Sequence, residues 1–458
     1  MRADTSKRHR FFDAIRRDGL FQSAACLFGV VAILYTFGCW TPPPQQVAAP
    51  TFAPPDGTSF TDSLDVTISC ATPGATIRYT TDGSEPTSSS GTIYTGPVHL
   101  TATTTIKAIA YKSGMTDSQV VSATYTKRVP QTNLVFTVKH RFLTGTHYST
   151  RIGGISLSPD GSRLGVAFWG DTSADPIREY STTDYSLQNE VGYGQCHGDV
   201  VYSADSRYFF SPSYYQGNFS RWDRWNGNQR TSLSAGSFPI ATGLTPNRTK
   251  AVVIAGSDGR NYNMRNDAVY VYDVSGSNFS IVATVSIPDE CHNGQVAFTP
   301  DGSTAYFTTM RQWEPGAPDR LYEFSLLTNS VTRTVDLPAT NGDTRGVAVG
   351  GNRIFVQDAI NSKIRVLDRQ SLTQIAVWDM AAPGFRIALS PDGTALYVLF
   401  PSLGSIAAYD VQTGSLLGQS ADLLIDPSDI EFSQDGRTVY VSGCGTRNGI
   451  VVLDVVPE

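Results

Sequence analysis

A four-residue turn motif returns at a nearly constant interval through about the last three hundred residues of this chain, and it limits the possible folds more than any other feature. The clearest copies read Ser-Pro-Asp-Gly, Thr-Pro-Asp-Gly or Ser-Gln-Asp-Gly, and three further copies are weaker. The intervals between successive copies run from 41 to 54 residues. The seven copies begin at Ser158, Ser203, Thr245, Thr299, Val349, Ser390 and Ser433.

Each copy has the chemistry of a tight turn, in which Pro fixes φ, Asp bonds nearby backbone and Gly accepts a positive φ. An apolar run precedes the turn, as at 387–389, and a β-branched or aromatic run follows it, as at 395–398. A third run ends in Asp, as at 407–410, and a polar turn then leads into a fourth. Four short strands per repeat, with a period in the forties, indicate the blades of a β-propeller.

The last repeat contains only three strands, at about 426–456, before the chain ends. An apolar segment at 134–139 lies just before the first full repeat and can supply the fourth strand. This pairing closes the ring and removes two exposed strand edges. We therefore predict that residues 131–458 form a seven-bladed β-propeller closed by the strand at 134–139.

The segments Tyr440-Val441-Ser442 and Tyr397-Val398-Leu399 follow the turn motif and precede the strand that ends in Asp. In this placement they resemble the YVTN-type β-propeller repeat of bacteria. The resemblance covers roughly residues 131–458 and implies an architecture, but propellers host many unrelated functions.

Residues 56–127 are predicted to form a separate small β-sandwich, because short Val-, Thr- and Ile-rich strands alternate there with turns. The segments 74–87 and 106–114 resemble the C-terminal domain of chitobiase and β-hexosaminidase. This resemblance implies an immunoglobulin-like accessory module, either a structural spacer, which we favour, or a carbohydrate-binding unit. The whole chain is thus predicted to be all-β, a seven-bladed β-propeller preceded by a small immunoglobulin-like β-sandwich.

The N-terminus has the features of an export signal, since a basic segment is followed by an apolar stretch at 20–37. Gly38-Cys39 then resembles a bacterial lipobox, which makes Cys39 the predicted lipidated residue. An uncleaved N-terminal anchor and a cleaved, secreted form are the alternatives for residues 1–39. Residues 40–55 are predicted to be a Pro-rich linker. We expect a membrane-anchored lipoprotein of the cell envelope, in the periplasm or at the cell surface.

The net charge of −6 is spread over a chain whose first 38 residues are basic, so the remainder is more acidic still. An acidic body without a basic patch argues against nucleic acid as a partner. The chain also has no G-x-S-x-G, H-E-x-x-H, P-loop or C-x-x-C-H motif. We therefore predict a monomer without a cofactor.

The loops between the second and third strands of the first four blades are long, and we expect them to share one face of the ring. Long loops that carry aromatic side chains are where binding tends to concentrate. The aromatic residues that we predict as ligand contacts on this loop face are Trp169, Tyr214, Tyr215, Tyr262 and Trp313.

Equivalent positions four residues before each turn motif are predicted to ring the mouth of the central channel. From these positions Asp199, Arg345, Arg386 and Asp429 are predicted ligand contacts, although a merely water-filled polar mouth is an alternative. The seven positions are Gly154, Asp199, Ala241, Gln295, Arg345, Arg386 and Asp429.

The pairs Cys196-His197 and Cys291-His292 begin the second and fourth blades at nearly the same repeat position. Cys and His are common zinc ligands, so the two pairs are weak candidates for a metal site. A Cys196–Cys291 disulfide and unpaired, partly buried side chains are the alternatives.

Two functional classes follow from these observations. The first, which we favour, is a non-catalytic propeller that binds a glycan polymer or a protein partner through its loop face. The second is a propeller lactonase-like hydrolase with a site at the channel mouth.

Overall fold

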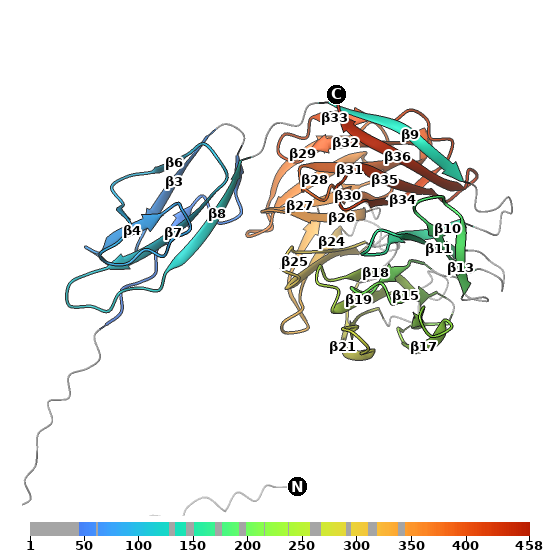
Figure 1. Cartoon of the computed structure of the whole chain (residues 1–458), viewed down its shortest axis with the longest axis horizontal. Coiled ribbons are helices and arrows are strands. Elements are labelled where there is room, and N and C mark those ends of the chain that lie inside the picture. The colour runs from blue at the N-terminus through green and yellow to red at the C-terminus, as the bar shows by residue number, and fades with distance from the viewer. Residues whose placement is uncertain are drawn as a thin grey trace, which may run out of the picture.

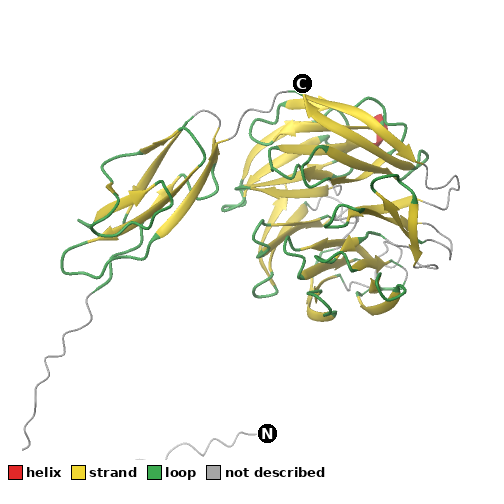
Figure 2. Ribbon diagram, viewed as in Figure 1, coloured by secondary structure: helices red, strands yellow, loops and turns green. Residues whose placement is uncertain are grey.

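The computed structural model describes residues 45–60, 63–127, 133–142, 151–169, 176–191, 198–214, 216–236, 238–256, 267–289, 295–309, 318–337 and 344–458. These residues form β-strands joined by turns, with one short 3-10 helix, η1 (Pro401–Leu403), which confirms the all-β prediction (Figure 2). Figure 1 shows two bodies, a small one built from β1 to β8 and a larger one built from β9 to β36.

The larger body consists of seven four-stranded antiparallel sheets, one for each turn motif. Blade 1 contains β10 (Arg151–Leu157), β11 (Arg163–Trp169), β12 (Ile177–Ser181) and β13 (Leu187–Val191). Blade 2 contains β14 (Val201–Tyr202), β15 (Tyr208–Ser213), β16 (Asn218–Asp223) and β17 (Gln229–Ser234). Blade 3 contains β18 (Pro239–Leu244), β19 (Lys250–Ala255), β20 (Ala268–Asp273) and β21 (Ser280–Ser286).

The remaining blades follow the same order from the inner to the outer strand. Blade 4 contains β22 (Val296–Phe298), β23 (Thr304–Thr309), β24 (Asp319–Ser325) and β25 (Ser330–Leu337). Blade 5 contains β26 (Thr344–Gly350), β27 (Arg353–Asp358), β28 (Lys363–Asp368) and β29 (Gln374–Asp379). Blade 6 contains β30 (Ile387–Leu389), β31 (Ala395–Phe400), β32 (Ser405–Asp410) and β33 (Leu416–Gln419). Blade 7 contains β34 (Pro427–Phe432), β35 (Thr438–Gly443), β36 (Gly449–Pro457) and β9 (Leu134–Phe142).

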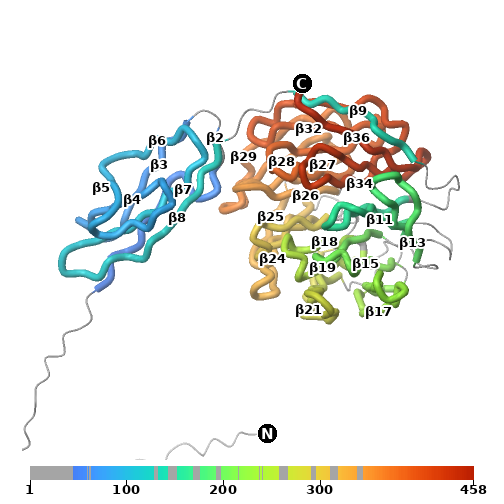
Figure 3. Tube along the Cα trace, in the orientation of Figure 1, coloured from blue at the N-terminus to red at the C-terminus, as the bar shows by residue number. Residues whose placement is uncertain are grey.

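The ring closes through blade 7, whose fourth strand comes from the other end of the larger body. β9 pairs antiparallel with β36, from Leu134 opposite Pro457 to Phe142 opposite Ile450, and the two ribbons lie side by side in Figure 3. The inner strands of neighbouring blades contact one another around the ring, and β34 contacts β10 of blade 1. β9 extends three residues beyond the 134–139 segment seen in the sequence.

The apolar core lies between blades, because each sheet buries both faces against its neighbours. One cluster joins Leu399 and Ile406 of blade 6 to Val441 and Val451 of blade 7, and Phe136 of β9 packs against it. Side-chain hydrogen bonds hold the turn motifs: Ser390 Oγ donates to Asp392 at 2.6 Å. The sheets are thus fixed both between blades and at their turns.

The smaller body is a two-layer sandwich. One sheet has the order β1 (Thr51–Ala53), β3 (Leu64–Ser69), β6 (Val98–Leu100). The other has the order β2 (Ser59–Phe60), β8 (Val121–Lys127), β7 (Thr104–Tyr111), β4 (Thr76–Thr80), β5 (Thr92–Ile93). This corrects the expected solvated linker over its described part, 45–55, because β1 pairs with β3 and Val47 is buried in the core of the sandwich.

Candidate functional site

A cavity of about 300 Å³ lies at the centre of the ring, between the inner strands. It brings together four of the seven positions that the sequence places at the channel mouth, one each from blades 2, 4, 6 and 7. Asp199, Gln295, Arg386 and Asp429 all line it. Arg345 does not line this cavity, and its guanidinium lies over the Phe385 ring at 5.4 Å from the centroid.

Asp429 links three blades from its place on the inner strand of blade 7. One carboxylate oxygen accepts the backbone N–H of Ile155 in blade 1 at 2.9 Å. The other accepts the N–H of Ile430 at 2.9 Å and forms an ion pair with Arg386 of blade 6. Because Asp429 is only 5% exposed, this set of contacts fixes the seam between the first and last blades.

Two further carboxyl groups in the cavity have raised pKa values, which favour their neutral forms. Burial raises the pKa of Asp199 to about 7, with Arg386 opposing the shift and Asp429 adding to it. Burial also raises the pKa of Glu431 to about 8, and the negative charge of Asp429 adds to that shift. Both groups therefore change charge near neutral pH.

The cations of the cavity are arranged around these acids. Burial by itself would lower the pKa of Arg386, but Asp429 and Asp199 together raise it above its usual range. Burial lowers the pKa of Arg248, whose Nη1 donates to the carbonyl oxygen of Tyr202 at 2.8 Å. The cavity thus combines fixed positive charge with carboxyl groups able to exchange protons near pH 7, a combination common at functional sites.

Among the described residues, no group of three or more His, Cys, Asp or Glu side chains has the arrangement of a metal site. The candidate ligands Cys196, His197, Cys291 and His292 lie outside the described residues, so the metal and disulfide hypotheses stay predictions. Cys39 and the loop residues Tyr215, Tyr262 and Trp313 also lie outside them, and Trp169 is described only as the last residue of β11.

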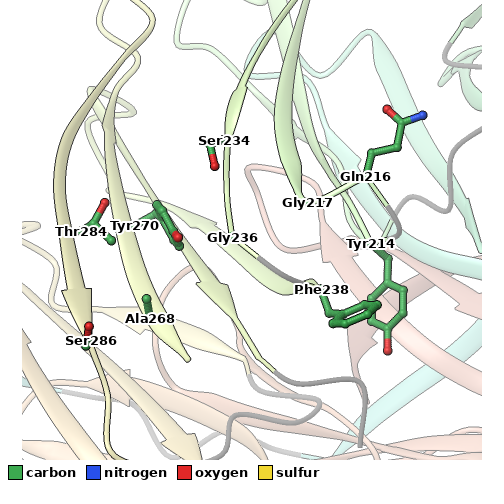
Figure 4. A pocket seen from close by; sticks show the side chains of 10 residues that line it. All are labelled: Tyr214, Gln216, Gly217, Ser234, Gly236, Phe238, Ala268, Tyr270, Thr284 and Ser286. Atoms are coloured by element: carbon green, nitrogen blue, oxygen red, sulfur yellow. The ribbon is translucent and has the colours of Figure 1, made fainter. Parts of the chain in front are cut away.

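Tyr214 is the described aromatic residue among the predicted loop contacts. It lines a second cavity, of about 470 Å³, between blades 2 and 3 (Figure 4). Its ring packs against Phe238, with the centroids 4.9 Å apart. The structure therefore places Tyr214 and the channel residues at separate cavities.

The two faces of the ring differ in how their buried polar groups are satisfied. At the ends of the strands that meet the loop face, several buried side-chain atoms have no hydrogen-bond partner in the described part of the chain. They are Ser213 Oγ, Gln295 Oε1, Thr309 Oγ1, Thr344 Oγ1 and both amide atoms of Gln357.

On the opposite face, the Ser or Thr that begins a turn motif donates to the Asp or Asn of the same motif, in every blade except blade 5, whose motif begins with Val349. Thr299 Oγ1 donates to Asp301 at 2.5 Å and accepts the N–H of Thr304 at 3.1 Å. Two exceptions lie among the described residues: Asn329, in a turn on that face, has one unpaired buried oxygen, and so has Thr242, which lies on β18 at the channel cavity. Since an unpaired buried polar atom costs about 1–3 kcal/mol, its concentration on one face marks that face as the place where hydrogen bonds remain to be made.

Sequence reasoning missed two residues of the channel. Glu431 stands two positions after Asp429 on the same strand, so the two-residue period of a strand could have placed both on one face. Arg248 belongs to the weak turn motif of blade 3, which the sequence shows only as a turn, although its side chain also lines the cavity.

Comparison with known proteins identifies the smaller body. Residues 54–122 match the family model of the chitobiase/beta-hexosaminidase C-terminal domain. This match covers most of the sandwich, without β1 and most of β8, and leaves the propeller unassigned. No curated protein matches the chain.

Among solved structures, the chain is similar to hydrazine synthase of Kuenenia stuttgartiensis, with a TM-score of 0.56 and 14% sequence identity. The alignment covers 69% of this chain and 100% of that chain. At this identity the similarity shows the fold and carries nothing about activity. Within the described residues, no helix has the length and apolar character needed to cross a membrane.

Proposed function

We propose that this protein is an exported, lipid-anchored component of the cell envelope whose β-propeller binds a glycan polymer or a protein partner through its loop face. The basic and apolar segments before Cys39 support export and anchoring. We further propose that the blades are YVTN-type repeats, on the strength of the motifs at 397–399 and 440–442.

The unpaired buried polar groups beneath the loop face are the observation that carries the binding proposal. Thr309 and Thr344 are both fully buried, and their hydroxyl oxygens have no partner among the described residues. Because neither hydroxyl is open to solvent, a partner can supply the missing bonds only where its binding shifts the loop above them or orders water beside them. The same face carries exposed apolar side chains at the turns of blades 5 and 6, Ile360 and Leu403, which suit an interface.

A binding experiment with matched surface variants tests this proposal. The purified chain is sedimented with isolated cell-wall polysaccharide and, separately, passed over immobilised envelope proteins. Ile360→Arg and Leu403→Arg, on the loop face, should each lower the fraction of the protein that is retained by the polysaccharide or by the immobilised proteins. Leu327→Arg, at an 81% exposed position in a turn on the opposite face, is the control. Equal loss from the control, or unchanged retention of both loop-face variants, would contradict the proposal.

The channel supports a second candidate, a lactonase-like hydrolase. The observation in its favour is the pair of carboxyl groups, Asp199 and Glu431, whose raised pKa values of about 7 and about 8 suit proton transfer. Lactone hydrolysis that disappears in Glu431→Gln, while the variant keeps its fold, would support this candidate. Wild-type protein without turnover across a lactone series would exclude it.

A further inference from the structure

The cavity that contains Tyr214 is a groove between the outer part of blade 2 and the outer part of blade 3. Its described lining comes from the turn between β15 and β16, from β17 and the turn that follows it, and from the strands β20 and β21. In Figure 4, Tyr214 and Phe238 lie against each other at one end, and Tyr270, Thr284 and Ser286 lie at the other. Its volume of about 470 Å³ falls within the range of small-molecule sites, about 300–1,000 Å³.

Glycines keep the floor of this groove open. Gly217 and Gly236 both have positive φ, and a Cβ on Gly217 would come within 2.3 Å of the Gly236 carbonyl oxygen. A Cβ on Gly236 would lie 2.6 Å from the Tyr270 hydroxyl. A larger residue at Gly217 would displace the backbone of the turn after β17, and one at Gly236 would displace Tyr270 of blade 3, so the shape of the groove depends on these two residues.

The aromatic walls are held in place by their own contacts. Tyr270 stacks beside Tyr272, with the ring planes 21° apart, and Tyr272 is fully buried. The Tyr272 hydroxyl donates to the carbonyl oxygen of Ser234 at 2.5 Å, which ties blade 3 to blade 2. Together with the Tyr214–Phe238 pair, these rings give two apolar surfaces that lose little conformational freedom on binding.

The remaining lining is polar and uncharged. Ser234, Thr284 and Ser286 are exposed hydroxyl residues, and Gln216 adds an amide. None of the described residues that line the groove is Asp, Glu, Lys or Arg. A charged ligand would lose its hydration there without gaining an ionic partner, so the groove suits a neutral ligand.

We propose that this inter-blade groove binds a neutral saccharide chain. A sugar ring presents an apolar face of C–H groups that packs on Tyr214, Phe238 or Tyr270, and its hydroxyls both donate and accept hydrogen bonds. The hydroxyls of Ser234, Thr284 and Ser286 also both donate and accept, which matches sugars better than proline-rich peptide, whose backbone has few donors. The inference rests on the proposed glycan-binding function and names the place on the propeller where binding occurs.

Isothermal titration of the purified chain with chitotetraose, cellotetraose and maltotetraose tests the proposal. We expect at least one of the three to bind, and Tyr214→Ala to weaken it by about tenfold or more. Thr284→Arg changes an exposed residue of β21, so it should leave the fold intact while blocking the groove with a charged side chain, again with a loss of about tenfold or more.

Two controls match these variants. Ser280→Arg lies on the same strand as Thr284 but outside the groove, and Trp225→Ala removes a 69% exposed aromatic residue from the opposite face of blade 2. Both should bind within about twofold of the wild type.

The outcomes separate this inference from the function on which it rests. Saccharide binding that survives both Tyr214→Ala and Thr284→Arg, but is lost in Ile360→Arg, would overturn the groove and leave the loop face as the binding surface. Binding of a peptide with the sequence of residues 41–55 in place of every saccharide would overturn the choice of ligand. Failure of all three saccharides to bind would overturn the groove inference, and the proposed function would then rest on a protein partner.

Discussion

Replacing the unpaired threonine hydroxyls of the loop face should make the free protein more stable and a worse binder. Val has nearly the shape of Thr, so Thr309→Val and Thr344→Val each remove a buried hydroxyl without opening a cavity. Both residues are fully buried, and neither hydroxyl oxygen has a partner among the described residues. We expect each variant to raise the free energy of unfolding by about 1 kcal/mol, the lower end of the cost of an unpaired buried polar group.

Thr299→Val is the matched control, because Thr299 is 2% exposed and has the same side chain with its bonds made. Its loss leaves Asp301 without the 2.5 Å hydroxyl donor and the Thr304 N–H without its acceptor at 3.1 Å. The control should therefore lower the free energy of unfolding by about 1–3 kcal/mol. Opposite signs for chemically identical substitutions would show that the difference lies in hydrogen bonding and not in side-chain shape.

Urea unfolding followed by tryptophan fluorescence measures these effects in the propeller, since Trp222 and Trp378 are buried there and residues 45–127 contain no Trp. The affinity of each variant for whichever polysaccharide or envelope protein the wild type binds is measured in parallel. A loss of stability in both loop-face variants would refute the reasoning, because it would mean that ordered water or another group already satisfies the hydroxyls of the free protein.

Three further predictions concern the ring, the channel and the N-terminus. Phe136→Ala should lower the free energy of unfolding by about 2 kcal/mol, because the ring of half-buried Phe136 packs against Tyr397 with the centroids 6.1 Å apart. The control, Val135→Ala, changes a 41% exposed neighbour on β9 and should alter the free energy of unfolding by less than about 0.5 kcal/mol. Similar losses from both variants would show that β9 does not seal the ring through its inner face. Burial raises the pKa of Glu431 from 4.5 in the unfolded chain to about 8 in the folded chain, so the free energy of unfolding should fall as the pH rises between these values. Urea titrations at pH 5 and pH 9 should show a smaller fall for Glu431→Gln than for the wild type. Cys39→Ala should move the protein out of the membrane fraction if Cys39 is lipidated, and retention with the leader attached would favour the uncleaved anchor.

The sequence predicted the architecture because each blade of a propeller is built from residues that are close together in the sequence. Each turn motif fixes a hairpin through Pro, Asp and Gly, and the missing strand of the last repeat pointed to an unpaired segment such as 134–139. The equivalent position before each turn also brought Asp199, Arg386 and Asp429 to one cavity, because repeats place equivalent residues at equivalent heights around the axis.

The groove between blades 2 and 3 could not be predicted in the same way. Phe238 packs against Tyr214, and Tyr270 lies at the other end of the groove, because the chain folds back tightly at Gly217 and Gly236. Contacts between blades leave no periodic signal in the sequence. The linker at 40–55 was misjudged for a related reason. Its Pro content indicates an extended, solvated chain, but burial of Val47 and pairing of β1 place residues 45–55 of it in the sandwich.

The pairing of β9 with β36 has a consequence for how the chain is made. Lys139 bonds Asp454 at 3.3 Å across 315 residues of sequence, so the first strand of the propeller waits for nearly the whole of the remaining chain to be synthesised. Until then six blades stand in an open arc with bare edges at both ends, and contacts so distant in sequence form slowly. We therefore expect blade 7 to be sealed late in the formation of the ring, and we expect removal of β36 to leave the arc unable to close.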